Sequence, residues 1–153
     1  MAIYQGSLNN NPSPGNKAGG ISTILEKSLG AIAKGGTSEL VDVIQYAEPI
    51  KTKGLVFMDS PGYDPVSVTG QVASGANVVC FTTTVRGSVF GCKPVPSLKL
   101  VTNFSMLFRM TEDMDLNCGE IIDDTTYVQE MGSIIFQKIL ATASGGLTNS
   151  VEF

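Results

Sequence analysis

Histidine is missing from this chain of 153 residues, and cysteine occurs only three times. The absence of histidine removes the commonest general base, every Ser-His-Asp triad and the commonest metal ligand from the chain's own chemistry. The three cysteines have no CxxC spacing, so they match neither a zinc ribbon nor an iron–sulfur motif. Charged residues make up 16% of the chain, below the ~25% of a typical globular protein, so no charged disordered tail is expected.

A basic surface and a long apolar run are also missing. The net charge is −4 and the pI is near 4.7, so we expect no nucleic-acid partner. The longest apolar runs, such as residues 77–81, fall far short of the ~20 residues that cross a bilayer, so no membrane partner is expected either. The N-terminus lacks a signal-peptide pattern, and few cysteines suit a reducing compartment. These features predict a cytoplasmic protein.

The chain reads as one domain over residues 1–153, because no repeat, linker or low-complexity tract divides it. Residues 1–18 are rich in asparagine and proline and predict an extended arm. The predicted strands cover residues 40–44, 54–59, 77–83 and 97–102. The predicted helices cover residues 24–33, 65–74 and 105–116, and a last helix begins near residue 126. This order predicts an α/β fold with a small, mainly parallel sheet and helices on its faces, Rossmann-like and three-layered, with a right-handed crossover between the second and third strands.

Three helix starts carry capping signals. Thr23 and Thr126 are each followed three residues later by glutamate or glutamine, the capping-box pattern. Asp64 followed by Pro65 predicts a helix with Asp64 as its N-cap.

Polar loops leave two of the predicted strands. One loop holds Asp59 and Asp64, and the other holds Arg86, Gly87 and Ser88. In open parallel sheets ligands bind beyond the carboxyl ends of the strands, and the guanidinium of Arg86 can bind a carboxylate through two hydrogen bonds. Two alternatives stay open at this point, a solvated surface role for Arg86 and a capping role for Asp64.

Asn16 and Lys17 precede the first predicted helix, where backbone N–H groups and a lysine charge favour an anion. The alternative is a well-ordered turn, since no P-loop or GxGxxG pattern is present. Cys80 is expected in the core of a strand, and Lys93 is expected to lower the pKa of Cys92 in its loop. The carboxylates at residues 112, 113 and 115 are interpreted as a solvated helix end in preference to metal ligands.

Six segments of the chain resemble, in the same order, the C-terminal region of the altronate dehydratase/galactarate dehydratase family. They are residues 11–20, 58–67, 87–94, 99–103, 114–119 and 143–145. The Pro-Gly-Tyr-Asp-Pro-Val sequence at 61–66 is more similar to the altronate branch of the family. One departure stands in the loop after the third strand, where Val85 precedes Arg86 in place of the family's usual glycine. A β-branched residue disfavours positive φ, which changes the expected path of this loop.

The resemblance implies a hydro-lyase that removes water from an aldonate or aldarate and gives a 2-keto-3-deoxy acid. It also implies dependence on iron(II) or another divalent metal, with no ligands assigned. The residues expected to contact the sugar acid are Asn16, Lys17, Asp59, Asp64, Arg86, Gly87, Ser88 and Lys93. Family members are several times longer, so the expected partners are the remainder of the full-length enzyme and further copies of it in a homo-oligomer.

Two other hypotheses belong to different classes. One is a non-catalytic ligand-binding or oligomerisation domain, and the other is an anion-binding module tied to another enzyme subunit. The missing histidine favours both, whereas the intact segments 11–20 and 59–67 favour the hydro-lyase. In either case, we expect the isolated chain to be inactive.

Overall fold

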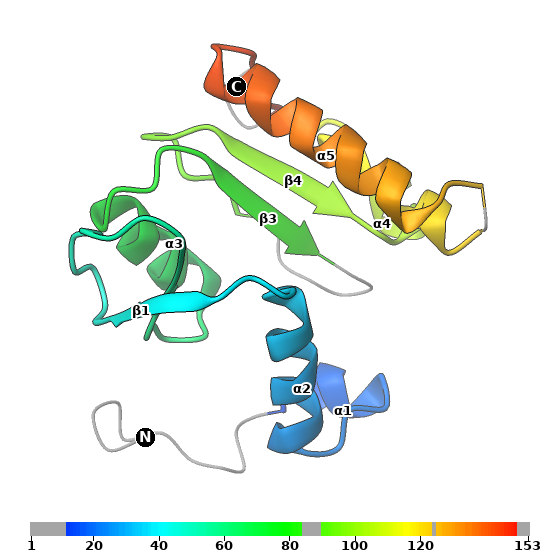
Figure 1. Ribbon diagram of the computed structural model, residues 1–153. Coiled ribbons are helices and arrows are strands. Elements are labelled where there is room, and N and C mark those ends of the chain that lie inside the picture. The colour runs from blue at the N-terminus through cyan, green and yellow to red at the C-terminus, as the bar shows by residue number, and fades with distance from the viewer. Residues whose placement is uncertain (1–11, 84–89, 124, 150–153) are drawn as a thin grey trace.

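The computed structural model describes residues 12–83, 90–123 and 125–149, which form five α-helices and five strands (Figure 1). The helices are α1 (Pro14–Ala18), α2 (Ile24–Lys34), α3 (Asp64–Ala73), α4 (Phe104–Arg109) and α5 (Val128–Ala143). The strands are β1 (Leu40–Ile44), β2 (Leu55–Met58), β3 (Val79–Thr83), β4 (Ser97–Val101) and β5 (Leu116–Asn117). A 3₁₀ turn, Gly119–Ile121, follows β5. The predicted α/β class is confirmed.

All strand pairs are parallel, but the strands of the described residues form two sheets instead of the single sheet predicted. One sheet pairs β1 with β2, and the other has the order β3-β4-β5. The expected crossover between the second and third strands within one sheet is therefore wrong, since α3 connects strands of different sheets. The alternation of strands and helices fixes the class, whereas strand pairing depends on contacts between distant segments.

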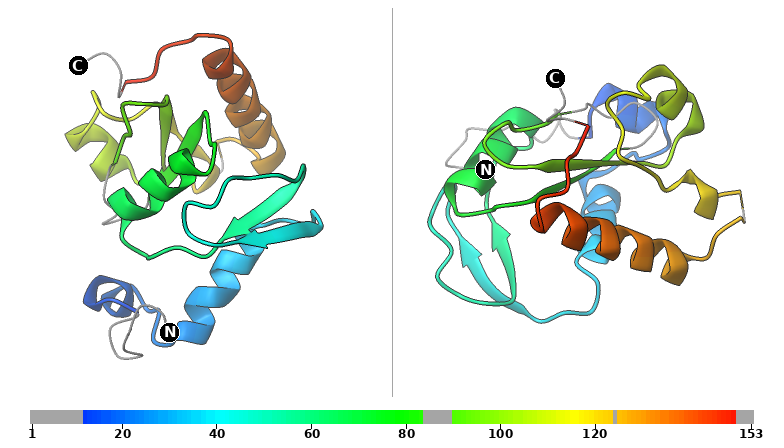
Figure 2. Two further views of the ribbon diagram at one scale, coloured as in Figure 1. Left: turned by 90° about the vertical axis from the view of Figure 1, so that its left-hand side faces the viewer. Right: turned by 90° about the horizontal axis from the view of Figure 1, so that it is seen from above.

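The three-stranded sheet has a helix on each face (Figure 2). On one face, Leu98 and Leu100 of β4 pack with Met131 of α5 and with Cys118. On the other face, Val101 packs with Met106 of α4 and with Met114. All five residues of β4 are buried, as expected for a central parallel strand covered on both sides.

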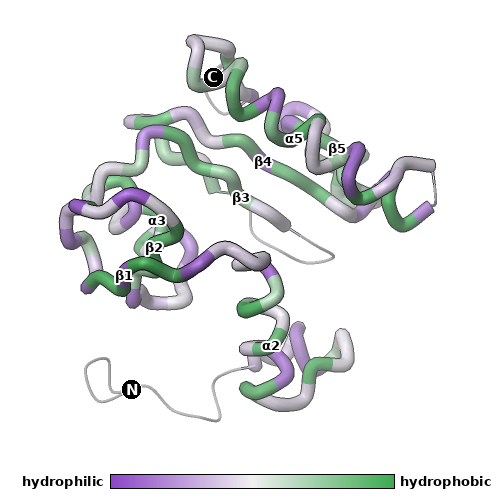
Figure 3. The backbone as a smooth tube through the Cα atoms, viewed as in Figure 1, coloured by the Kyte–Doolittle hydropathy of each residue, from purple (hydrophilic) through white to green (hydrophobic). Residues whose placement is uncertain are grey.

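The two-stranded sheet is covered on one face by α3. The Tyr46 hydroxyl donates to the Val66 carbonyl at 2.8 Å, and the Ile50 N–H donates to the Ser74 carbonyl at 3.0 Å. Ile44 is buried on this side. The other face carries exposed apolar side chains, and the apolar colouring of β1 and β2 is visible in Figure 3.

Of the three predicted N-cap residues, one is confirmed and two are wrong. At α2, Thr23 and Glu26 form the predicted capping box. At α3 the N-cap is Tyr63, and Asp64 lies one position later in the first turn, where its charge still favours the helix dipole. At α5 the N-cap is Tyr127, because the Thr126 hydroxyl donates to the Glu120 carboxylate at 3.3 Å instead.

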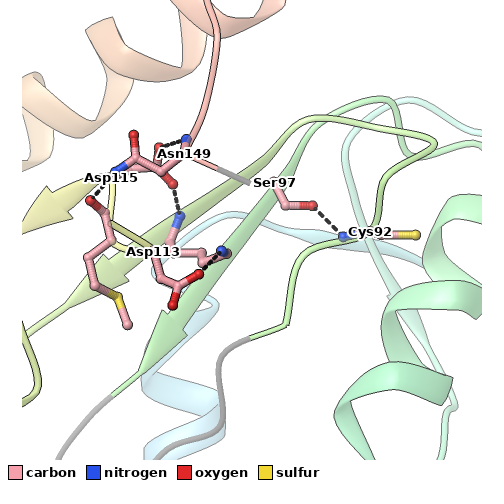
Figure 4. Close-up of polar contacts among 7 residues, drawn as sticks. Cys92, Ser97, Asp113, Asp115 and Asn149 are labelled. Atoms are coloured by element: carbon pink, nitrogen blue, oxygen red, sulfur yellow. Dashed lines mark hydrogen bonds and ion pairs between the residues drawn. The ribbon is translucent and has the colours of Figure 1, made fainter. Parts of the chain in front are cut away.

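The helix predicted over 105–116 is too long. It ends at Arg109, and residues 116–117 form β5. The Asp115 carboxylate accepts from the backbone N–H of Lys99 at 2.8 Å and from that of Asn149 at 2.9 Å (Figure 4). Lys99, only 4% exposed, lies 3.5 Å from the Asp113 carboxylate. These carboxylates are therefore not a solvated helix end, since they bind β4 and the C-terminal segment.

The predicted arm is also corrected where the structure describes it. Residues 14–18 form the short helix α1, with Pro14 at its start and a capping box between Ser13 and Asn16. Pro14 has a backbone φ angle that suits the first turn of a helix. The prediction of an extended arm treated this proline only as a turn former. No helix within residues 12–83, 90–123 and 125–149 combines the length and apolar character needed to cross a membrane.

Replacing Asp115 tests its role in holding β4 and the C-terminal segment. We expect Asp115→Ala to lower the free energy of unfolding by about 2–3 kcal/mol, because two backbone donors lose a charged acceptor. Asp115→Asn keeps one acceptor oxygen and should lose roughly half as much. Urea unfolding measures both. The exposed Glu112 supplies the control Glu112→Ala, and an Asp115→Ala protein as stable as this control would contradict the assignment.

Gly70 tests the contact between α3 and the β1–β2 sheet. A Cβ at Gly70 would overlap the ring of Tyr46. Gly70→Ala should therefore lower stability by about 1–3 kcal/mol through overpacking, although alanine is normally the better helix former. The matched control is Gly62→Ala, where the added Cβ meets no atom within 4 Å. Equal unfolding midpoints for the two variants would show that the Tyr46 contact does not hold α3.

Candidate functional site

A cavity of about 440 Å³ lies at the carboxyl end of the β1–β2 sheet. Its apolar part comes from the strands and the connection between them, and its polar part comes from the loop after β2 and from α3. The lining residues are Ile44, Ile50, Val56, Phe57, Met58, Asp59, Ser60, Gln71, Ser74 and Ala76. This is the edge at which parallel sheets bind ligands, and the volume is in the range of small-molecule sites.

The polar side of the cavity is held in place by hydrogen bonds. The backbone N–H of Asp59 donates to the Ile44 carbonyl at 2.9 Å, which extends the β1–β2 ladder by one bond and fixes where Asp59 begins the loop. The hydroxyls of Ser60 and Ser67 lie 3.0 Å apart, and the Gln71 amide donates to Ser67 at 3.4 Å. A carboxylate, a hydroxyl and an amide therefore stand on one wall.

Ser74 and Met58 form another wall of the cavity. The buried Ser74 hydroxyl donates to the Gly70 carbonyl at 2.9 Å and lies 3.5 Å from the Met58 sulfur. The Ser74 hydroxyl is thus engaged within the protein. Ser60 and Gln71 keep hydrogen-bonding capacity beyond their contacts with Ser67, so they and Asp59 are the groups that could bind a ligand. Such a set suits a polyhydroxylated molecule, because carboxylates accept from hydroxyls and an amide both donates and accepts.

The predicted site residues are only partly brought together. Asp59 lines the cavity. Asp64 lies in the first turn of α3, and Lys93 is exposed in the loop before β4. Neither lines the cavity as described. Arg86, Gly87 and Ser88 lie outside the described residues, so their expected contacts stay predictions.

Asn16 and Lys17 lie within α1 instead of a loop before a helix. The Asn16 side chain accepts from Ser13 and from the Lys27 ammonium at 3.2 Å, so it is used in capping and in a contact with α2. In the described part of the chain neither residue lines the β1–β2 cavity. The expected contacts of Asn16 and Lys17 with an anion stay a prediction, although their segment is a capped helical turn and not a loop.

Ser60 and Gln71 were not among the predicted ligands. Gln71 reaches the cavity only because α3 packs against the β1–β2 sheet, so the sequence carried no local signal for it. At the other sheet, Asn103 and Asn117 also follow or end strands, but both serve the backbone. Asn103 caps α4 by accepting from Met106 at 2.9 Å, and Asn117 accepts from Gly119 at 2.9 Å.

The cysteines differ from expectation. Cys80 is exposed on β3 and not in the core, whereas Cys118 is buried. Partial burial raises the pKa of the Cys80 thiol. Burial, helped by the nearby Glu120 charge, raises the pKa of the Cys118 thiol. Both shifts keep these thiols protonated and slow to react at neutral pH, and Cys92, half-buried with its N–H bonded to Ser97 at 3.1 Å, stays the predicted reactive thiol.

Comparison with known proteins places this chain in a family. The sequence matches, over residues 1–153, the family described as D-galactarate/altronate dehydratase, C-terminal. It is 40% identical over 139 residues to an altronate dehydratase of Bacillus subtilis, covering 91% of this chain and 28% of that protein. It is 42% identical over 135 residues to the galactarate dehydratase (L-threo-forming) of Escherichia coli, covering 88% of this chain and 26% of that protein.

A third relative carries a different name. The (2R)-sulfolactate sulfo-lyase subunit beta of Chromohalobacter salexigens is 37% identical over 140 residues, which cover 91% of this chain and 36% of that protein. The chain thus spans about a quarter to a third of the length of these relatives. With a family match along its whole length, the chain belongs to the D-galactarate/altronate dehydratase family and corresponds to the C-terminal domain of its members.

Proposed function

We propose that the chain is the C-terminal domain of a sugar-acid hydro-lyase that acts on an aldonate or aldarate. The reaction removes the proton α to a carboxylate and expels the β-hydroxyl as water. The enol that forms tautomerises to a 2-keto-3-deoxy acid. Support comes from the family match and from two relatives named as altronate and galactarate dehydratases.

The compounds in the relatives' names are chemically similar. Altronate, galactarate and sulfolactate are all hydroxy-carboxylates, so a site that recognises a carboxylate and an adjacent hydroxyl would serve each of them. The sugar acids differ from sulfolactate in their further hydroxyls. The polar wall of Asp59, Ser60 and Gln71 supports the sugar acids, because it offers partners for several hydroxyls.

The β1–β2 cavity is the observation that carries this proposal. Asp59 is an anion, so it would accept hydrogen bonds from substrate hydroxyls and not bind the substrate carboxylate. The carboxylate needs a cation, and we propose Arg86 for it, since a guanidinium binds a planar carboxylate with two hydrogen bonds. Lys17 and Lys93 stay proposed as further cationic contacts. Asn16, Asp64 and the Gly87–Ser88 backbone stay proposed as uncharged or hydroxyl-binding contacts.

A divalent metal, with iron(II) the first candidate, stays part of the proposal for the assembled enzyme only. Within the described residues no three cysteine, aspartate or glutamate side chains gather as a metal site would require, and the chain contains no histidine. The described part of the domain therefore does not fit a metal centre, and no step is assigned to one here.

The same residues indicate what this domain and the remainder of the enzyme would each contribute to the reaction. This domain would hold the polyol part of the sugar acid, while the remainder of the enzyme would supply the base that removes the α-proton. A cytoplasmic location is proposed with it, in keeping with three free cysteines.

Asp59 tests the proposed function in the complete dehydratase, meaning the polypeptide or complex in which this chain occurs in its own cells. A hydrogen bond to a charged group contributes about 1.5–3 kcal/mol, so Asp59→Asn should raise KM for altronate or galactarate roughly 10- to 150-fold. Formation of the 2-keto-3-deoxy acid is followed with added iron(II). We expect Arg86→Lys to weaken substrate binding as well, because lysine cannot form the paired hydrogen bonds.

The control is Asp123→Asn, which removes an exposed carboxylate away from the cavity and should leave KM unchanged. Equal KM values for Asp59→Asn and this control would remove the cavity from the proposal. A folded complete protein that turns over neither sugar acid would favour the non-catalytic binding domain.

A further inference from the structure

Helix α2 lies outside the two sheets, with the short helix α1 beside it (Figure 1). Ile24 is half-buried and the other ten residues of α2 are exposed. Leu25, Leu29 and Ile32 recur at helical spacing on one side, and Ile32 is 71% exposed. A free helix of 11 residues is marginal in water, and most helices gain their stability by packing an apolar side. The apolar side of α2 therefore lacks the cover that its pattern calls for.

The outer face of the β1–β2 sheet is uncovered in the same way. Val43 and Phe57 are register partners on the two strands and are 58% and 59% exposed. Parallel sheets are normally buried on both faces, and a sheet of two strands is marginal by itself. Here α3 covers one face only.

The two exposed regions form one continuous surface. A second cavity, of about 490 Å³, is lined by Ile32 of α2 together with Leu40, Leu55 and Phe57 of the sheet. We call the exposed apolar side chains of α2, β1 and β2 around this cavity the α2–β2 surface. Ile32, Leu40, Leu55 and Phe57 line the cavity, and Leu25, Leu29 and Val43 are exposed on the same elements outside its lining. Exposed apolar patches of this kind in soluble proteins mark interaction sites.

The α2–β2 surface adjoins the proposed substrate site. Val56 and Phe57 line both the apolar cavity and the polar cavity that contains Asp59. A partner seated on Phe57 would therefore lie next to the polar cavity. Ligand sites are commonly found at such boundaries between domains.

We propose that the α2–β2 surface docks onto the preceding, larger part of the dehydratase, and that this contact completes the sugar-acid cavity beside it. The relatives are three to four times longer than the matched region, which covers 26–36% of them, so ample protein is available to cover it. The occupant is an apolar face of that part, which places aliphatic or aromatic side chains over Ile32 and Phe57. This inference rests on the proposed function only for the identity of the partner.

Hydroxyl-radical footprinting tests the docking without any substrate. Phe57 and Phe136 are 59% and 57% exposed, and Phe136 lies on α5, away from the α2–β2 surface. In the 153-residue chain alone, both side chains should be oxidised at similar rates. In the complete dehydratase, Phe57 should be oxidised at least fivefold more slowly, while the rate at Phe136 stays unchanged.

Unchanged oxidation of Phe57, or equal protection of both phenylalanines, would overturn the proposal. A dimer of the 153-residue chain would also overturn it, if Phe57 is protected in that dimer and Phe57→Glu converts the dimer to a monomer in sedimentation. The occupant would then be a second copy of the chain. Ile32→Glu in the complete enzyme should restore oxidation of Phe57 at least threefold, with Leu147→Glu, a change at another exposed leucine, as its control.

The two proposals can fail separately. Protection of Phe57 in a complete protein that dehydrates no sugar acid would support the docking and reject the function. Full dehydratase activity with an unprotected Phe57 would reject the docking and leave the function in place.

Discussion

Parallel β-strands need cover on both faces, and this chain provides it for one of its two sheets. The β3-β4-β5 sheet lies between α4 and α5, and every residue of β4 is buried. The β1–β2 sheet has α3 on one side and exposed valine and phenylalanine on the other. The difference matters because the covered sheet can hold itself together, whereas the other depends on what is placed against it.

The candidate site lies on the β1–β2 sheet, which is covered on one face only. Asp59 and Ser60 follow β2 directly, and their loop is fixed by a backbone bond to Ile44 and by the pair of Ser60 and Ser67. The apolar part of the same cavity runs into the uncovered face through Phe57. Under the proposed function, the polar groups of this loop would form part of a binding site that the remainder of the enzyme completes.

The elements were predictable where the signal was local. The capping box at Thr23 and the β-branched run at 40–44 each depend on a few neighbouring residues, and both elements form as expected. The division of the strands into two sheets was not predictable, since strand pairing is set by contacts between segments distant in the sequence. The predicted end of α4 was wrong for a related reason. Asp115 accepts from Lys99 and Asn149, residues 16 and 34 positions away, and no helical periodicity carries that information. At the site, Asp59 was found because it follows an apolar strand, whereas Gln71 reaches the cavity only through the placement of α3.

Native-state hydrogen exchange on the 153-residue chain tests most directly the claim that its two sheets differ in self-sufficiency. Amides within β4 should exchange only through global unfolding, while those shared by β1 and β2 should exchange through local opening, at least about 100-fold faster. Such a ratio corresponds to roughly 2.7 kcal/mol between the two openings. Equal protection of both sheets in the isolated chain would contradict the account, because the β1–β2 sheet would then need no partner.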